Sequence, residues 1–325
     1  MPEQRLSRNT GLDLVRTTEA AALVAARWMG LGLRDEADQA ASTAMASVLD
    51  GLEIDGRIVC GEEGRDSPPT ALVGGRQVGT GRGVAVDVVV DAIDGRRLLA
   101  RGRPGAVAVA AVSTRGALWS PAPALYMDKL VVDRTVAPYL VPECLDAPAA
   151  WTLGLIARAK RKAVRDLTIF VLERPRHADL IDEIRAAGAR VMLADDGDIS
   201  GALLAASHDS PVDALMGVGG TAEGVIAACA VKALGGGMLA RLAPQSPAEA
   251  AAVADAALDT RRVRSLEDLI SGNQIFFVAT GITDGLLLKG VHFDGDRAST
   301  NSLILRSETR TRRLIFAEHL LEHGS

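Results

Sequence analysis

The sequence predicts a fold of the α/β class that is divided into two subdomains. The first observation is the alternation of helical patterns, short apolar stretches and polar loops between residues 150 and 234. This alternation is typical of parallel strands joined by right-handed helical crossovers. The second is an apolar run over residues 84–90, broken by one aspartate, which is typical of a strand buried on both faces. The third is the proline-containing stretch 141–149, which predicts a linker between subdomains 1–145 and 146–325.

The first subdomain is expected to begin with two helices and to continue with strands. Apolar residues recur at helical spacing up to Trp28, and Gly30 and Gly32 end the first helix. A short strand that ends at Cys60 leads into an acidic loop rich in Gly and Pro, and such loops carry function more often than the scaffold does. The predicted elements are helices over residues 10–29 and 35–49 and strands over 57–60, 84–90, 106–112 and 126–132.

The second subdomain contains the clearest alternation. Its first three strands are each followed by a polar loop, at residues 173–177, 195–198 and 217–224. In parallel sheets, ligands bind at the carboxyl ends of strands, which is where these loops are expected to lie. Predicted helices cover residues 150–164, 179–187, 199–206, 225–234 and 247–258, and predicted strands cover 167–172, 190–193, 214–216, 274–278, 302–305 and 311–316.

Charge and composition argue against several classes of function. The net charge of −5 gives no support for nucleic-acid binding. No stretch of about eighteen uninterrupted apolar residues occurs, so no membrane span is expected, and the N-terminus does not have the pattern of a signal peptide. The three cysteines form no CxxC pair, which argues against a disulfide framework or a zinc site. The sequence therefore predicts a soluble, cytoplasmic protein.

The motifs of common nucleotide-binding and hydrolase families are absent or incomplete. Residues 217–222 follow a predicted strand and open a helix, as a dinucleotide-binding loop does. However, no Asp or Glu occurs between Val225 and Ala248 to bind the ribose hydroxyls, and Glu223 would place a negative charge beside the pyrophosphate. The chain contains no GxxxxGKS or GxxxxGKT string and no GxSxG elbow.

Two aspartates at a strand end are the strongest local signal for chemistry. Asp91 and Asp94 follow the apolar run and precede Gly95, so one tight turn would hold both carboxylates. Like charges held this close repel unless a cation lies between them. The hard ions Mg²⁺ and Mn²⁺ suit carboxylate oxygens. A solvated Asp-Gly turn is the alternative interpretation.

Other acidic and basic residues are placed at the ends of neighbouring strands. Acids hold hard metals and basic groups hold phosphates, so the combination suits metal-assisted hydrolysis of a phosphate ester. A kinase would use similar groups but would need a nucleotide-binding string, which the sequence lacks. His177, beside Arg176, is the histidine expected nearest to such a site. The acids are Glu62, Asp66, Asp91, Asp94 and Glu223, and the bases are Arg82, Lys129, Arg174 and Arg176.

Ordered motifs along the whole chain resemble class II fructose-1,6-bisphosphatases. Asp91-Ala-Ile-Asp94-Gly95 is similar to the Asp-Pro-Ile-Asp/Glu-Gly-Thr signature of lithium-sensitive sugar and inositol phosphatases. The other matching motifs are Thr18-Glu19-Ala-Ala-Ala-Leu23, Ala37-Asp38, Ile54-Asp55-Gly56, Gly61-Glu62, Val78-Gly-Thr-Gly-Arg-Gly83, Tyr126-Met-Asp-Lys-Leu130, Arg174-Pro-Arg-His177, Asp196-Gly-Asp198, Gly219-Gly220, Glu223-Gly224 and Ala279-Thr-Gly-Ile-Thr283.

The resemblance implies a layered αβαβα sugar-phosphatase sandwich and a hydrolase that depends on Mg²⁺ or Mn²⁺. The implied reaction removes the 1-phosphate of fructose 1,6-bisphosphate to give fructose 6-phosphate, in gluconeogenesis or Calvin-type carbon metabolism, with sedoheptulose 1,7-bisphosphate as a further substrate. The positions that match metal ligands are Asp38, Glu62, Asp91, Asp94 and Glu223, those assigned to catalysis are Glu62, Asp66 and Asp94, and those that match sugar-phosphate contacts are Tyr126, Arg174, Pro175, Arg176, Asp196, Gly197, Asp198 and Gly220. The many Val- and Leu-rich strands are compatible with a homo-oligomer, either a dimer or a tetramer.

The departures from the family pattern lie mostly near the implied metal site. Arg96 stands where the pattern has a Thr whose hydroxyl is thought to orient the attacking water. A guanidinium has no lone pair with which to accept a hydrogen bond, and its charge would compete with a metal ion. In the loop over residues 61–69, Gly64 and Ser67 replace acids of the pattern, whereas Asp66 is retained.

Two further departures keep the charge and change the shape of the side chain. Asp94 replaces a Glu of the pattern, and Arg174 replaces a Lys with a planar, forked group. Two hypotheses follow from these matches and departures. The first is a working sugar bisphosphatase with an altered set of water-positioning groups, and the second is a phosphosugar-binding relative with little or no catalysis.

Overall fold

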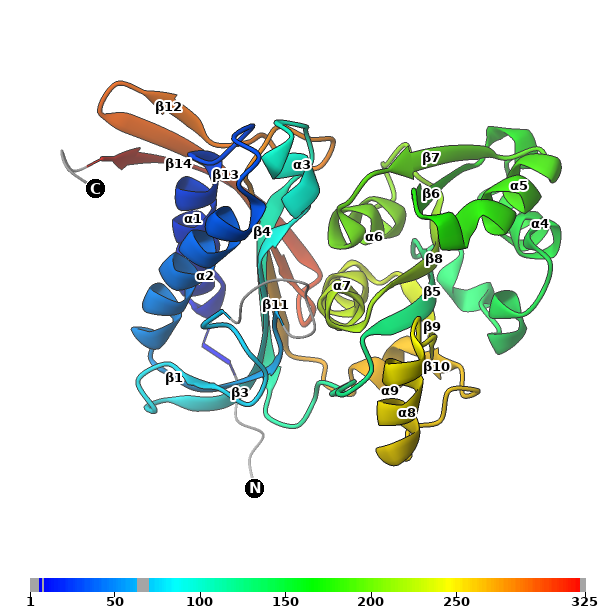
Figure 1. The fold of residues 1–325 in the computed structure, drawn as a ribbon, viewed down its shortest axis with the longest axis horizontal. Helices are drawn as coiled ribbons and strands as arrows, with labels where there is room; N and C mark the ends of the chain where they lie inside the picture. The colour runs from blue at the N-terminus through cyan, green and yellow to red at the C-terminus, as the bar shows by residue number, and fades with distance from the viewer. Residues whose placement is uncertain (1–5, 8, 63–69, 322–325) are drawn as a thin grey trace. The chain divides into compact units, whose positions relative to one another are not determined.

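The computed structural model describes residues 6–7, 9–62 and 70–321 (Figure 1). The chain forms two compact units, and the first is discontinuous. Unit 1 consists of residues 1–118 and 272–325, and unit 2 consists of residues 119–271. The sequence analysis places one boundary near residue 145, whereas in the structure the chain leaves unit 1 after Leu118 and returns to it at Gly272. The return occurs because the C-terminal strands pair with the N-terminal sheet.

Unit 1 is built on an eight-stranded sheet with the order β12-β13-β11-β4-β3-β1-β2, to which β14 is added by pairing with β13. Its central strand β3 is buried over nine consecutive residues, as expected for the Val-rich run that the sequence singles out. The strands are β1 Ile54–Cys60, β2 Gln77–Val78, β3 Val84–Asp94, β4 Val107–Thr114, β11 Ile275–Gly281, β12 His292–Asp294, β13 Arg297–Arg306 and β14 Thr311–Leu320.

Two long helices cover one face of this sheet. Helix α1 (Thr10–Ala26) contacts the strands from β3 to β13, and α2 (Arg34–Asp50) packs against α1 and β3 (Figure 1). Alanines and leucines of both helices interlock with the Val and Ile side chains of the sheet in one hydrophobic core. A third helix, α3 (Arg96–Ala100), follows β3 directly and begins after Gly95, whose φ of 98° favours glycine. The carboxyl end of β3 therefore turns abruptly at the two aspartates.

Unit 2 is built on a six-stranded sheet with the order β10-β9-β5-β8-β6-β7. Strand β6 is parallel to β7 and β8, as the alternation predicts, whereas β5 is antiparallel to both of its neighbours. The sequence analysis does not predict β9, which lies beside β5. The strands are β5 Tyr126–Val132, β6 Thr168–Leu172, β7 Arg190–Ala194, β8 Ala214–Gly220, β9 Gly237–Leu242 and β10 Arg264–Ser265.

Helices cover both faces of the unit 2 sheet (Figure 1). Helices α6 and α7 lie on one side of the sheet, and α4 and α5 lie on the other. The α-helices are α4 Ala149–Lys160, α5 Ala178–Ala186, α6 Asp198–Ala206, α7 Thr221–Leu234, α8 Pro247–Asp255 and α9 Leu266–Leu269, and the 3₁₀ turns are η1 Ala137–Tyr139, η2 Pro142–Leu145, η3 Val164–Asp166 and η4 Pro175–His177. The mixed α/β fold with two subdomains is confirmed, and the five-layer order stays a prediction.

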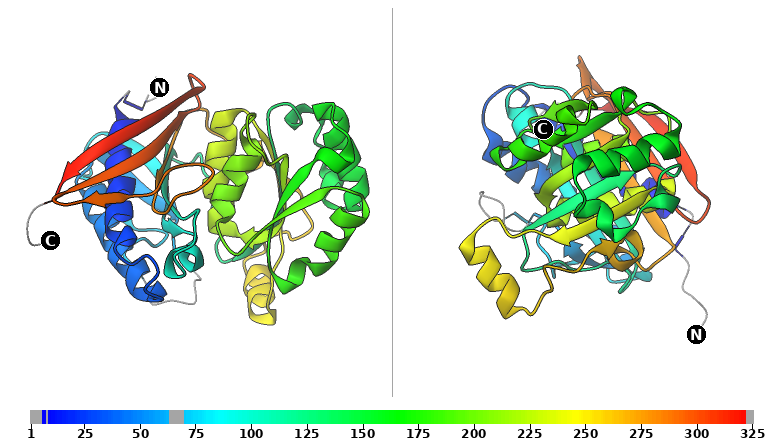
Figure 2. Two further views of the ribbon diagram at one scale, coloured as in Figure 1. Left: turned by 90° about the horizontal axis from the view of Figure 1, so that it is seen from above. Right: turned by 90° about the vertical axis from the view of Figure 1, so that its right-hand side faces the viewer.

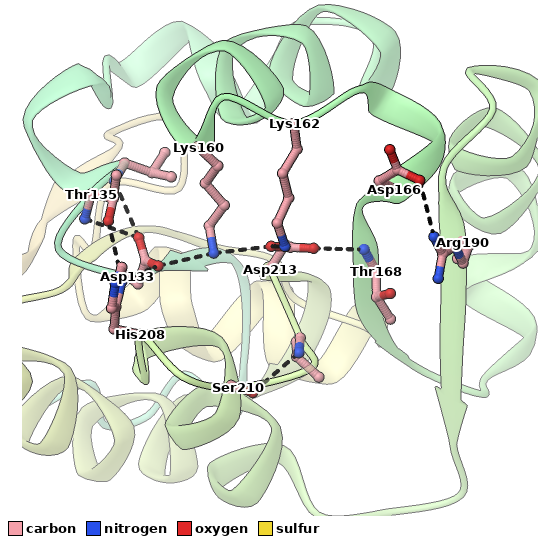
Figure 3. Close-up of polar contacts among 12 residues, drawn as sticks. Asp133, Thr135, Lys160, Lys162, Asp166, Thr168, Arg190, His208, Ser210 and Asp213 are labelled. Atoms are coloured by element: carbon pink, nitrogen blue, oxygen red, sulfur yellow. Dashed lines mark hydrogen bonds and ion pairs between the residues drawn. The ribbon is translucent and has the colours of Figure 1, made fainter.

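A largely buried network of ion pairs connects Asp133, Lys160, Lys162 and Asp213 at one end of the unit 2 sheet (Figure 3). Lys160 Nζ lies 2.9 Å from Asp133 Oδ2 and 3.0 Å from Asp213 Oδ1, and Lys162 Nζ lies 2.6 Å from the same oxygen of Asp213. Asp133 follows β5 and Asp213 precedes β8, so this network lies at the opposite end of these strands from Tyr126 and Gly220. Both aspartates are buried and charge-paired, which is the condition under which buried charges are tolerated.

Among the described helices, none is both long and apolar enough to cross a membrane. The cytoplasmic location inferred from the sequence stays a prediction.

Candidate active site

The carboxyl end of β3 gathers the acidic residues that the sequence assigns to unit 1. Asp91 pairs with Val109 and Asp94 pairs with Val107, so β3 has one more residue than β4 between these two pairs. In this irregular turn the Asp91 carboxylate accepts a hydrogen bond from the backbone N–H of Ile93, at 3.0 Å. Both carboxylates are buried. The turn therefore holds the two acids away from solvent, contrary to the alternative of a solvated Asp-Gly turn.

Glu62 reaches the same turn from the end of β1. Its Oε1 accepts a hydrogen bond from the backbone N–H of Ala92, at 3.2 Å, and its Oε2 accepts hydrogen bonds from Ser42 and Thr70, at 2.6 and 2.5 Å. Ser42 lies one helical turn after Asp38 on α2, so both side chains point to the same side of the helix. The sequence analysis missed Ser42, although this i, i+4 spacing from a predicted ligand is a signal that identifies it.

Asp38 is buried on α2 and forms an ion pair with Arg96, the residue that departs most from the family pattern. Arg96 Nη1 donates a hydrogen bond to Asp38 Oδ2 at 3.1 Å, and the arginine side chain is largely buried. The predicted competition between Arg96 and a metal ion therefore has a specific geometry, because the guanidinium contacts one of the five predicted metal ligands.

The five predicted metal ligands are divided between the two units. Asp38, Glu62, Asp91 and Asp94 are all buried in unit 1, whereas Glu223 belongs to unit 2, in the first turn of α7. Across residues 6–7, 9–62 and 70–321, no group of three or more His, Cys, Asp and Glu side chains is arranged to hold a metal ion. The donor type nevertheless fits Mg²⁺ or Mn²⁺, because all four buried side chains offer carboxylate oxygens. Asp66, together with Gly64 and Ser67, lies outside the described residues.

The predicted sugar-phosphate residues all lie at one end of the unit 2 sheet. Arg174 to Arg176 follow β6, Asp196 to Asp198 follow β7, and Gly220 ends β8. Tyr126 begins β5, and because β5 is antiparallel to β8 it pairs directly with Gly220. These eight residues, from four strands, share one end of the sheet. The strand-end rule predicts this placement for the three loops, whereas Tyr126, at the amino end of the antiparallel strand β5, was implied only by the family resemblance.

Two arginines at this edge are oriented by neighbouring main-chain carbonyls. Arg174 Nη1 donates to the carbonyl of Asp195 at 2.6 Å, and its Nη2 lies 3.3 Å from Asp196 Oδ1. Arg176 Nη2 donates to the carbonyl of Val218 at 2.9 Å, and its guanidinium lies over the Tyr126 ring at 5.1 Å from the ring centroid. Each guanidinium is thereby held near the ends of β6, β7 and β8, where a planar donor suits a phosphate.

A buried ion pair joins β5 to the start of α6 at this end of the unit 2 sheet. Lys129 Nζ lies 2.5 Å from Asp198 Oδ2, and both residues are buried. A Cβ atom on Gly219 would lie 2.0 Å from that carboxylate oxygen and 2.3 Å from the lysine nitrogen, so glycine is required for this close approach. Lys129, expected to bind phosphate, therefore balances the charge of Asp198, and Asp198 also begins helix α6.

His177 has a structural part in unit 2. Its Nδ1 lies 2.7 Å from the carbonyl of Leu172, and its Nε2 accepts a hydrogen bond from the backbone N–H of Val218 at 2.8 Å. These contacts fix the neutral tautomer with the proton on Nδ1. Burial lowers the pKa of His177, which keeps the ring neutral. The ring joins the ends of β6 and β8, which positions the loops that follow both strands.

Arg82 is the one basic residue that does not belong to either group. It precedes β3, whereas Asp91 and Asp94 are at the other end of this strand, and its side chain is exposed. The expectation that Arg82 lies at a strand end beside the acids is therefore wrong, because an eleven-residue strand separates them.

Comparison with known proteins identifies the family of the chain. A family model described as bacterial fructose-1,6-bisphosphatase, glpX-encoded, matches residues 8–319. The chain belongs to the class II fructose-1,6-bisphosphatase family. The resemblance inferred from the motifs, and with it the prediction of a hydrolase of this class, is confirmed.

Curated relatives match almost the whole chain. The chain is 38% identical to a protein of Haemophilus influenzae named fructose-1,6-bisphosphatase class 2, over 98% of each chain. It is 38% identical to a Synechococcus protein named D-fructose 1,6-bisphosphatase class 2/sedoheptulose 1,7-bisphosphatase, over 97% of this chain and 96% of the relative. It is 37% identical to fructose-1,6-bisphosphatase 1 class 2 of Escherichia coli, over 98% of this chain and 97% of the relative.

Proposed function

We propose that this family member removes the 1-phosphate of fructose 1,6-bisphosphate, with Mg²⁺ or Mn²⁺ as its cofactor. The observation that carries the proposal is the set of four buried carboxylates around the end of β3, in a chain that matches the family over its whole length. Side chains from α2, the end of β1 and the end of β3 offer the carboxylate oxygens that hard metal ions prefer as ligands.

In this proposal, the residues of unit 1 hold the ions and those of unit 2 hold the sugar phosphate. Divalent ions, when bound, lower the pKa of coordinated water and neutralise the phosphoryl oxygens. Asp91 and Asp94 would supply ligands from the turn, Asp38 from α2 and Glu62 from the end of β1. Ser42 and Thr70 orient the Glu62 carboxylate by donating to Oε2. Glu223, in the first turn of α7, is the fifth residue whose position matches a metal ligand of the family.

Substrate recognition is assigned to the end of the unit 2 sheet at which Tyr126 and Gly220 lie. Arg174 and Arg176 would contact the phosphate that is retained in the product, each with N–H groups that are already directed by carbonyl contacts. Sedoheptulose 1,7-bisphosphate offers the same two kinds of group, a phosphate at carbon 1 and a second phosphate at the far end.

Phosphate release over a panel of sugar phosphates tests the proposal. The panel consists of fructose 1,6-bisphosphate, sedoheptulose 1,7-bisphosphate and fructose 6-phosphate, each with Mn²⁺, with Mg²⁺ and with a chelator. We expect release from one or both bisphosphates that needs a metal and falls at least about 100-fold in Asp91→Asn. Asp50→Asn, an exposed change on α2, is the matched control and should retain full activity. Release no faster than that of Asp91→Asn would overturn the proposal.

The ion pair between Arg96 and Asp38 favours a second candidate function, a phosphosugar-binding protein with little catalysis. The guanidinium occupies one oxygen of a predicted metal ligand and offers no acceptor to a water molecule. Under this alternative, the unprocessed bisphosphate binds at the unit 2 edge, and Arg96→Thr raises a slow rate of phosphate release. Fast release by the unaltered protein, unchanged in Arg96→Thr, would exclude it.

A further inference from the structure

A cavity of about 340 Å³ lies on one face of the unit 1 sheet, beside its C-terminal strands. Its walls come from the loop over residues 284–291 and from β12, β13 and β14, all of which belong to unit 1. Figure 2 shows these three strands, in orange to red, next to one another. The volume lies in the range of small-molecule sites, roughly 300–1,000 Å³. The described residues that the proposed function uses do not line this cavity.

The strands contribute four side chains from one face of the sheet. His292 of β12 is paired with Ser299 of β13. Asn301, two positions further along β13, is paired with Phe316 of β14. Paired residues, and residues two positions apart on a strand, point to the same face. Thr300, between the two residues of β13, donates a hydrogen bond to a glutamate of α1 at 3.3 Å, so the cavity lies on the face that α1 does not cover.

The loop over residues 284–291 is fixed by its own contacts. Asp284 Oδ1 accepts a hydrogen bond from the backbone N–H of Gly290 at 3.0 Å. A Cβ atom on Gly290 would lie 2.6 Å from the carbonyl carbon of Thr283, so the loop is packed against the chain that enters it. Thr283 ends the motif Ala279–Thr283, which matches the family pattern and has no part in the proposed function. This motif therefore leads into a well-defined wall of the cavity.

Four polar side chains of the lining make no hydrogen bond or ion pair with any other residue that the structure describes. These side chains are Lys289, His292, Ser299 and Asn301. Ser299 and Asn301 are only partly exposed, whereas Thr300 between them is hydrogen-bonded to His319 at 2.9 Å. Polar groups that surround a cavity without partners in the protein are available to a ligand.

The groups in the cavity match the chemistry of a sugar. The Ser299 hydroxyl and the Asn301 amide both donate and accept hydrogen bonds, as sugar hydroxyls do, and Lys289 donates whereas Asp284 accepts. The lysine and aspartate charges cancel, so the lining favours neither a polyanion nor a metal ion. The ring of Phe316, with an exposed fraction of 63%, offers an apolar surface to the C–H groups of the ligand.

We propose that this cavity is a second sugar-binding site, which holds a ketose or its phosphate by the hydroxyl groups. Ser299 and Asn301 bind the hydroxyls from the sheet, Lys289 binds them from the loop, and the Phe316 ring packs against the carbon atoms. The choice of a ketose rests on the proposed function, in which substrate and product are both ketose phosphates. Occupancy of the cavity does not depend on catalysis, so it is measured separately from phosphate release.

A tryptophan placed at the cavity of the full chain tests the proposal. Phe316→Trp keeps an aromatic ring at the wall and reports an occupant by a change in its fluorescence. We expect a saturable change with fructose 6-phosphate at up to about 10 mM, because a site with a Kd of about 1 mM is then nearly filled. Leu320→Trp, on the same face of β14 but outside the cavity, is the matched reporter and should not respond.

Two further probes identify the group that is recognised. Inorganic phosphate should give no response. A response to fructose as well as to fructose 6-phosphate shows that the hydroxyls suffice, and a response to fructose 6-phosphate alone shows that the phosphate contributes. An equal response to inorganic phosphate would identify a plain anion site and overturn the proposal.

Variants of the reporter protein locate the response. Asn301→Leu should weaken the binding of fructose 6-phosphate at least about tenfold, because an amide that donates and accepts is lost. Asn273→Leu, the same change at an exposed position before β11, should not. The response should persist in Arg174→Ala, which alters the proposed substrate site of unit 2. No response to fructose 6-phosphate, equal responses of both reporters, equal affinities of the two asparagine variants, or loss of the response in Arg174→Ala would each overturn the proposal.

Discussion

The acidic turn of unit 1 and the basic edge of unit 2 contain the two halves of the proposed chemistry, and their side chains are held in different ways. In unit 2, main-chain carbonyls orient Arg174 and Arg176, and a buried lysine neutralises Asp198. In unit 1, an arginine that departs from the family pattern is paired with a predicted metal ligand. In the proposed function, phosphate recognition would therefore rest on side chains held by the strand framework, whereas metal binding would depend on a few side chains such as Asp38 and its partner Arg96.

The largest expected effect concerns the end of the unit 2 sheet that lies away from the candidate site. Asp213→Asn removes the carboxylate that Lys160 and Lys162 share. Because Lys160 keeps its pair with Asp133 and Lys162 is partly exposed, we expect a loss of about 1.5–3 kcal/mol, the range for a hydrogen bond to a charged group. Chemical denaturation measures this loss. KM should stay unchanged, because the network lies at the other end of β5 and β8 from Tyr126 and Gly220. The control Asp166→Asn removes only an exposed pair with Arg190. Equal stability of the two variants would contradict the prediction.

The same network sets a pH dependence. Burial by itself would raise the pKa of Asp213, but hydrogen bonds from Lys162, the Thr168 backbone and Lys160 outweigh it, so the pKa lies below its ordinary value. A carboxylate with a lowered pKa stabilises the folded state above its unfolded pKa of about 3.9 and loses this contribution as the pH falls through the folded pKa. The stability difference between the unaltered protein and Asp213→Asn should therefore shrink below about pH 4.

The second-largest expected effect is on KM, and it tests whether Arg174 and the neighbouring loops of unit 2 bind the substrate. Arg174→Ala should raise KM for the bisphosphate roughly ten- to hundredfold, because a charge-assisted contact to phosphate is lost, with kcat changed much less. Arg174→Lys should recover part of this loss, which a purely structural role of the guanidinium would not allow. The matched control is Arg190→Ala, at the other end of β7. An unchanged KM in Arg174→Ala would show that this arginine only braces the loop at Asp195.

The smallest effect concerns the metal affinity of unit 1. Arg96→Thr removes a positive charge from Asp38, so Mn²⁺ should bind about tenfold more tightly, as measured by calorimetry without substrate. Arg97→Thr, the neighbouring exposed position of α3, makes the same change in charge and should alter the affinity little. Equal gains in both variants would point to net charge rather than to the contact with Asp38, and would contradict the comparison.

Much of the fold was predictable because its signals are local. The long helices α1 and α2 and the buried strands β3 and β5 follow from periodicity and from Val-rich runs. Strand β9 was missed because Gly235 to Gly237 and the following short apolar stretch resemble a loop. The division of the chain was also not predictable locally, because the partner of β4 is β11, far along the sequence.

The candidate site was predictable where residue type and strand end coincide, as for Arg174, Asp196 and Gly220. The partners of these residues were not, because the contact between Arg96 and Asp38 spans 58 positions and depends on how α2 packs beside the end of β3. The burial of Lys129 also does not follow from its charge. It depends on Asp198 and on the glycine that leaves room for both.

The discontinuity of unit 1 has a consequence for how the protein is made. Strands β4 and β11 are neighbours in one sheet, and all of unit 2 is synthesised between them. On the ribosome, unit 2 therefore emerges complete before β4 has its second neighbour, although it begins later in the sequence. Until β11 is synthesised and pairs with β4, β4 is an exposed edge strand with apolar side chains. Rapid synthesis and pairing of the C-terminal strands therefore protects the nascent chain against misassembly.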